Sequence, residues 1–191
     1  SQSLPVPVAI INDNKVEANE VYNVTLSGIS ASGRNVTFGT NTATGTIVND
    51  DAAVVTLSGG IAKNEGNAGT TSYVFTATLN NPVQGGFILP YTTNNGTATT
   101  ADNDYQDNDA SLNFTGTAGE TKTFTVASVA DNKVEANETF QTVLTGLTLP
   151  PGITAVTIVG SPQTATIVND EVDFGDAPDT YGTLLASNGA R

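Results

Sequence analysis

Apolar residues recur at every second position through much of this chain, and threonine fills many of the positions between them. The pattern is clear in residues 72–79, where Tyr73, Phe75, Ala77 and Leu79 are two positions apart. Such residues share one face of a β-strand, and this face is expected to lie in a core. No segment shows the 3.6-residue period of an amphipathic helix. The pattern therefore predicts a chain made of strands.

Seven segments between residues 52 and 171 have this strand character, and Gly, Asn, Asp and Pro separate them. Their spacing is typical of two packed antiparallel sheets with Greek-key connections. We therefore predict an all-β fold, an immunoglobulin-like antiparallel β-sandwich with a Greek key and seven strands. The predicted strands are residues 54–58, 72–79, 87–91, 110–114, 121–129, 139–147 and 163–168.

Two segments of the sequence are repeated. Residues 13–20, DNKVEANE, recur unaltered 118 residues later, and residues 44–51 recur at 164–171 with two substitutions. A repeat of this length indicates tandem modules, of which one is complete and one is partial. We predict the C-terminal half of a module in 1–51, a complete module in 52–171, and the start of a further module or a linker in 172–191.

Residues 1–51 raise the question of how half a module covers its core. Val6, Val8 and Ile10 correspond in the repeat to part of 121–129, so they predict an equivalent strand, although Pro5 and Pro7 remove amide donors from one edge. Strand exchange with a second chain is one way to complete the half. No Gly/Ser-rich or Pro-rich linker separates 1–51 from 52–171, which favours a restrained rod.

The net charge of −13 and the absence of His and Cys limit which partners the chain can bind and which catalytic or metal sites it can form. Such a surface repels nucleic acid and attracts cations. Zinc–thiolate sites, disulfides and thiol nucleophiles are excluded. No run of about 18 apolar residues occurs, so we expect no membrane insertion.

Acidic residues gather in the loops between the predicted strands, at positions that a sandwich can bring to one end. The candidate metal ligands are Glu65 before the second strand, Asp104 after the third, Asp131, Glu135 and Glu138 after the fifth, and Asn169, Asp170 and Glu171 at the end of the seventh.

Clustered carboxylates need a counter-ion, since two of them about 4 Å apart repel by roughly 4 kcal/mol at an effective dielectric near 20. Oxygen ligands select calcium over zinc or copper, and irregular loops suit calcium better than magnesium. The octapeptide lacks the alternating ligands and the glycine of an EF-hand loop. The sequence therefore predicts Ca2+ as the cofactor, held by another kind of site.

Residues 52–171 resemble the Calx-beta module of sodium/calcium exchangers and of tandem arrays in large bacterial surface proteins. Four motifs carry the resemblance: Asn64-Glu65-Gly66, Gly96-Thr97-Ala98 with Asp104-Tyr105, the segment 131–140, and the segment 165–171. The resemblance implies calcium ligands at one end of an immunoglobulin-like sandwich. Strongly binding exchanger domains carry further acids where this chain has Ala130 and Asn169, so we expect fewer or weaker ions.

A second, incomplete metal site is expected in the partial module, because the counterparts of Glu65 and Asp104 are missing from residues 1–51. Its candidate ligands are Asp13, Glu17, Glu20, Asp50 and Asp51.

The interpretation that we favour is a non-catalytic, calcium-rigidified spacer or adhesion segment of a large secreted or surface protein, next to other repeat modules. Three alternatives stay open: a solvated acidic surface, a module that recognises a polysaccharide or a cell-surface protein, and a glycosidase-like pair of carboxylates. Loss of glycan binding on mutating Tyr91 or Tyr105 would favour recognition. Asp173, Asp176 and Asp179 are more typical of a turn-rich lead-in than of ligands.

Overall fold

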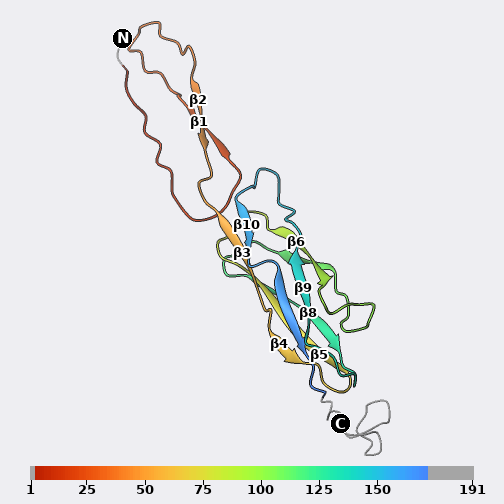
Figure 1. The fold of residues 1–191 in the computed structure, drawn as a ribbon. Helices are drawn as coiled ribbons and strands as arrows, with labels where there is room; N and C mark the ends of the chain where they lie inside the picture. Colours follow the sequence, from red (N-terminus) through yellow and green to blue (C-terminus); the bar gives the residue numbers. More distant parts are fainter. Residues whose placement is uncertain (1–2, 172–191) are drawn as a thin grey trace, which may run out of the picture.

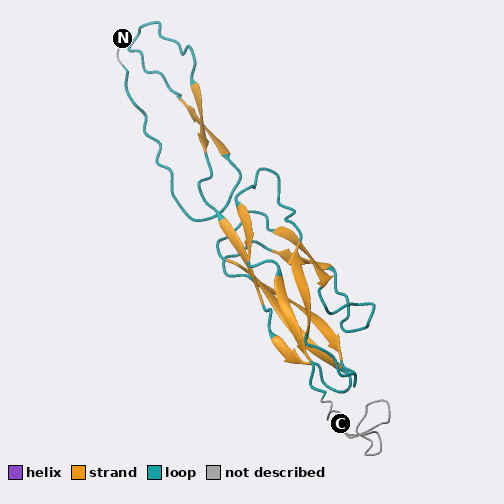
Figure 2. Ribbon diagram, viewed as in Figure 1, coloured by secondary structure: helices purple, strands orange, loops and turns teal. Residues whose placement is uncertain are grey.

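The computed structural model describes residues 3–171, which consist of strands joined by loops (Figure 2). This part of the chain contains no helix that is long and apolar enough to cross a membrane. Residues 3–51 form a narrow lobe at one end of a larger β-structure (Figure 1). The strands are β1 (Glu20–Thr25), β2 (Thr42–Ile47), β3 (Ala53–Ser58), β4 (Ala62–Asn64), β5 (Thr70–Leu79), β6 (Phe87–Asn95), β7 (Ala110–Phe114), β8 (Thr121–Val129), β9 (Glu138–Leu144), β10 (Val156–Val159) and β11 (Gln163–Val168).

Residues 52–171 form two sheets, one with the order β10-β3-β5-β8 and one with the order β4-β11-β9-β6-β7. Pairing is antiparallel except between β10 and β3 and between β11 and β4. The predicted all-β sandwich is confirmed, and each of the seven predicted strands is present. The predicted number of strands is too low, because β4 and β10 bring the total in residues 52–171 to nine.

The two additional strands are short, so a pattern of period two does not reveal them. β4 has three residues and follows β3 after Gly59-Gly60, where the chain crosses from the first sheet to the second. Gly59 has a φ of +130°, and a Cβ there would lie 2.5 Å from the carbonyl oxygen of Val74. Glycine is therefore needed at the crossing.

The core lies between the two sheets of residues 52–171. The predicted inner face of β5 is buried, as are Phe124 and Val126 of β8. Aromatic rings connect the sheets: Tyr73 meets Phe140 edge to face with centroids 5.3 Å apart, and Tyr91 stacks on Phe124 at 3.9 Å. These contacts fix how the sheets pack, and hence which loops meet at each end.

The lobe repeats part of this architecture. β1 pairs with β2 so that Glu20 is opposite Ile47, and β9 pairs with β11 so that Glu138 is opposite Ile167. These residues correspond in the sequence repeat, so the two strand pairs have the same register.

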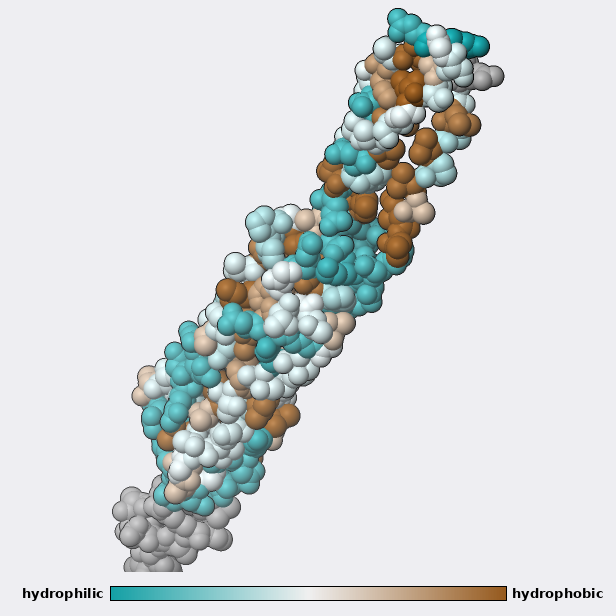
Figure 3. All heavy atoms as spheres, turned by 180° about the vertical axis from the view of Figure 1, so that it is seen from behind, coloured by the Kyte–Doolittle hydropathy of each residue, from teal (hydrophilic) through white to brown (hydrophobic). Residues whose placement is uncertain are grey.

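The predicted strand at Val6, Val8 and Ile10 is wrong, because residues 3–15 form no strand. In the complete module the corresponding β8 pairs with β5, and residues 3–51 contain no counterpart of β5. These three side chains are therefore exposed. Figure 3 shows apolar side chains gathered on this lobe.

Candidate metal centre

The predicted ligands of the complete module gather at one end of the sandwich, opposite the lobe (Figure 1). Five segments deliver them. Glu65 follows β4, Asp104 lies in the loop after β6, Asp131 and Glu135 lie between β8 and β9, Glu138 opens β9, and Asn169, Asp170 and Glu171 follow β11.

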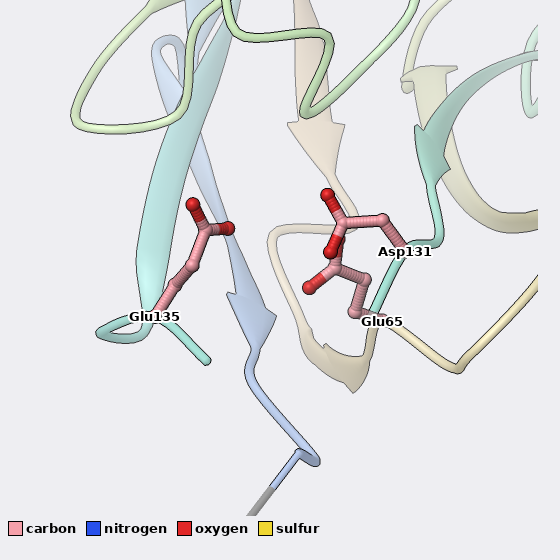
Figure 4. A group of neighbouring side chains, drawn as sticks. All are labelled: Glu65, Asp131 and Glu135. Carbon is pink, nitrogen blue, oxygen red and sulfur yellow. The ribbon is translucent and has the colours of Figure 1, made fainter. Parts of the chain in front are cut away.

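Two groups of three carboxylates approach closely enough to hold a metal ion. Glu65, Asp131 and Glu135 form one group, and Asp104, Glu135 and Glu138 form the other, with oxygen atoms within 4.8 Å of one another in each. Figure 4 shows the carboxylates of Glu65 and Asp131 side by side, with that of Glu135 directed toward them from the opposite side. Glu135 belongs to both groups and joins them into one acidic cluster.

Several of these side chains are withdrawn from water. Glu65 is 5% exposed, Asp104 7% and Glu171 9%. One Asp104 oxygen accepts a hydrogen bond of 2.7 Å from the Thr99 amide. Glu171 Oε1 accepts one of 2.8 Å from Asn67, while its buried Oε2 has no hydrogen-bond partner within residues 3–171. A buried, unpaired carboxylate oxygen is costly, and a cation is one partner that could offset this cost.

The proximity of these acids raises their affinity for protons. Burial, followed by the negative charges of Asp131, Glu171 and Glu135, raises the pKa of Glu65 to about 7. Burial and the neighbouring Asp104 raise the pKa of Glu138 to about 7. Both shifts mean that negative charge at this end of the sandwich is destabilised unless a cation or a proton offsets it.

Asn169 and Asp170 hold the acidic segments together. Asn169 Oδ1 accepts a hydrogen bond of 3.0 Å from the Glu135 amide, and its Nδ2 donates one of 2.8 Å to the Glu171 carbonyl oxygen. Asp170 Oδ1 accepts from the Gly66 amide at 2.8 Å. These bonds give the two side chains a positioning role that the sequence pattern did not predict, although the recurrence of Asn169 as Asn49 in the repeat was a signal for it.

The same arrangement occurs in the lobe. Asn49 Oδ1 accepts from the Glu17 amide at 2.8 Å, and Asn49 Nδ2 donates to the Asp51 carbonyl oxygen at 2.9 Å. Burial and the charges of Asp50, Asp13 and Glu17 raise the pKa of Asp51. Asp13, Glu17, Asp50 and Asp51 line one cavity, and Glu20 opens β1 as Glu138 opens β9. Both groups with close carboxylate oxygens lie in residues 52–171.

Tyr91 and Tyr105, considered above as ligand contacts, are core residues. They are 6% and 3% exposed, and their hydroxyl groups bond to Asn108 and Asn95. Phe38 is the one exposed aromatic side chain between residues 3 and 171. Asp173, Asp176, Asp179 and the predicted segment 172–191 lie outside the described residues.

Several solved structures match part of this chain. A crystal structure of the apo form of the Calx CBD1 domain has a TM-score of 0.49 and 18% sequence identity, and the match covers 61% of this chain and 98% of that one. The CBD12 of CALX1.2 gives 0.49 and 19%, over 61% of this chain and 46% of that one. The calcium binding domain CBD12 of CALX1.1 gives 0.48 and 17%, over 62% and 44%.

No curated protein sequence matched the chain. The family model described as the Calx-beta domain matches residues 1–51 and again residues 49–171. The two matches overlap at residues 49–51 and together span residues 1–171, and the chain therefore belongs to the Calx-beta domain family.

Proposed function

We propose that residues 52–171 form a non-catalytic calcium-binding module that serves as a calcium-rigidified spacer or adhesion segment of a large surface or secreted protein. The observation that carries the proposal is the cluster of Glu65, Asp104, Asp131, Glu135 and Glu138, with two groups of close oxygens that share Glu135. Lys133 pairs with Glu135, and within residues 3–171 no other salt bridge involves these five carboxylates. A divalent cation would offset the excess negative charge of this cluster.

Calcium is the ion that this site suits best. All the candidate ligands are oxygen atoms, and they come from separate loops that can adjust to a large ion. Ala130 and Asn169 lower the charge of the site, which favours modest affinity. Extracellular calcium modules work with dissociation constants of roughly 0.1 to 1 mM, so modest affinity is compatible with a role outside the cell.

The ion would stiffen the end of the sandwich at which one module meets the next. With calcium bound, the loops that hold Glu65, Asp104 and Asp131 are drawn together. Without it, their mutual repulsion loosens them. The partners would be calcium ions and neighbouring modules, and a second chain could complete the lobe by strand exchange. The site would be outside the cell or on its surface.

Thermal unfolding with and without calcium tests the binding. At a calcium concentration about 100 times the dissociation constant, the ion adds roughly 2.7 kcal/mol to the free energy of unfolding. We expect millimolar calcium to raise the melting temperature relative to excess chelator. Glu135→Gln should remove most of this difference, because Glu135 belongs to both groups of oxygens.

Glu120→Gln is the matched control. Glu120 lies in the turn between β7 and β8 and belongs to neither carboxylate group, so its replacement should leave the calcium-dependent difference intact. Equal melting temperatures of the unaltered chain in calcium and in chelator would refute the proposal. Magnesium at the same concentration tests selectivity and should give a smaller rise.

A further inference from the structure

The lobe is attached to the sandwich through the centre of its octapeptide. Val16 is fully buried and belongs to the hydrophobic core of the sandwich, although it comes from the lobe. Its amide donates a hydrogen bond of 2.9 Å to the Pro82 carbonyl oxygen, and its own carbonyl oxygen accepts one of 2.9 Å from the Gln84 amide. Val16 thus forms a parallel bridge with Val83.

The receiving surface lies at the lobe-facing end of the sandwich. It consists of residues 82–84, between β5 and β6, and of Gly152. The side-chain oxygen of Gln84 accepts a hydrogen bond of 3.3 Å from the Ala18 amide. A Cβ at Gly152 would lie 2.9 Å from the Cβ of Ala18, so a larger residue there would push the octapeptide away. We call these residues the docking edge.

The second octapeptide has the same sequence, and it repeats the hydrogen bond from the lysine amide to the aspartate and the lysine–glutamate ion pair. Its valine, however, is exposed. Val134 corresponds to Val16 and is 36% exposed, whereas Val16 is 0% exposed. In each copy an asparagine, Asn49 or Asn169, holds the amide of the glutamate that follows the valine. The loop that presents Val134 is therefore built like the loop that docks.

We propose that Val134 docks on the docking edge of another Calx-beta module, as Val16 does on this one. The octapeptide would then have two roles: its acids belong to the candidate metal site, and its valine joins that end of one module to the next. The chain itself identifies the partner surface, because the first octapeptide already packs on residues 82–84 and Gly152. The inference rests on the proposed function in one respect, that the chain works beside other modules of this family.

A tandem protein tests this directly. Residues 52–171 contain every member of the hydrophobic core except Val16, together with both sheets, so they can fold as a unit. A second copy of 52–171 is joined directly after residue 171, which reproduces the junction between 51 and 52. The added module then offers a docking edge to Val134.

Spin labels report the docking. The chain has no Cys, so Thr123→Cys in both modules gives a single pair of labels on exposed positions of β8. We expect a narrow distribution of label distances in saturating calcium, and a clearly broader one for Val134→Asn. Val74→Asn is the matched control, because Val74 is an exposed valine on the outer face of β5, and it should leave the distribution narrow.

The lobe provides the positive control. With labels at Thr25 and Thr123 in the original chain, Val16→Asn should broaden the distance distribution, because it removes the observed docking. If Val16→Asn does so while the unaltered tandem gives a distribution as broad as that of its Val134→Asn variant, the inference is overturned. Calcium binding is measured separately by melting, so loss of docking with an intact calcium effect refutes this inference alone.

Discussion

At the scale of single residues, identical sequence does not give identical surroundings. Val16 and Val134 occupy the same place in the same octapeptide, yet the first is buried and the second exposed. Asn49 and Asn169, by contrast, make the same hydrogen bonds in both copies. Contacts within the octapeptide and its neighbouring strand end are thus set locally, whereas burial of the valine depends on a second module.

Asn169 is the residue whose replacement tests this local framework. Asn169→Ala removes the acceptor of the Glu135 amide and the donor to the Glu171 carbonyl oxygen. We expect the free energy of unfolding to fall by about 1–3 kcal/mol, since two partly buried groups lose their partners. Calcium affinity should fall as well, because the Glu135 loop is no longer held.

Urea denaturation and calcium titration measure these two effects. Asn113→Ala is the control, because Asn113 is exposed on β7 and has no side-chain hydrogen bond within residues 3–171. An Asn169→Ala chain with unchanged stability would show that the bonds to Glu135 and Glu171 are replaced by water at no cost.

At the scale of elements, short turns hold the strands in place. The turn between β7 and β8 is closed by Glu120, whose carboxylate accepts hydrogen bonds from the amides of Thr115 and Gly116 and pairs with Lys122 at 3.0 Å. Burial alone would raise the pKa of Glu120, but these bonds lower it to about 2. The turn is therefore stabilised by the charged form.

Glu120→Ala should reduce the free energy of unfolding at pH 7 by about 2 kcal/mol, which is typical of hydrogen bonds to a charged group. The folded pKa lies below the unfolded value of about 4.5, so this contribution is present above pH 4.5 and is lost as pH falls toward 2. Urea denaturation of both chains at pH 7 and pH 2.5 measures it. A difference that stays constant over this range would contradict the assignment to the carboxylate.

At the scale of the whole molecule, opposite ends of the sandwich have different characters. One end carries the acidic cluster, and the other carries the docking edge that receives the lobe (Figure 1). Such polarity suits end-to-end stacking, since the octapeptide of one module meets the opposite end of the next. The stability of the sandwich should also depend on pH through the acidic end.

Glu65 and Glu138 have pKa values raised to about 7, from an ordinary value of 4.5. Between pH 4.5 and about pH 7 the folded chain binds more protons than the unfolded chain, so the free energy of unfolding decreases as pH rises. In chelator we expect a higher melting temperature at pH 5 than at pH 8. Saturating calcium should reverse this order, because deprotonated carboxylates bind the ion.

The double variant Glu65→Gln, Glu138→Gln is the control, and its melting temperature in chelator should vary less over this range. A melting temperature of the unaltered chain that rises steadily from pH 5 to pH 8 in chelator would contradict the shared charge repulsion.

The alternation of apolar residues was enough to predict the seven longer strands of residues 52–171, and the repeat was enough to predict tandem modules. These features depend on local periodicity, which a sequence displays directly. β4 was not predicted, because three residues are too few to show a period of two. The strand predicted at Val6, Val8 and Ile10 does not form, because residues 3–51 provide no neighbouring strand for it to pair with. Pairing is not a local property.

The sequence by itself determined the all-β class, the acidic residue set and the choice of hard oxygen ligands, because residue types and their spacing carry that information. Tertiary structure alone decided that Glu135 joins two groups of carboxylates, that Asn169 positions the loops, and that Val16 is buried where Val134 is not. The reason is physical: burial, repulsion between charges and docking depend on distances between segments far apart in the chain.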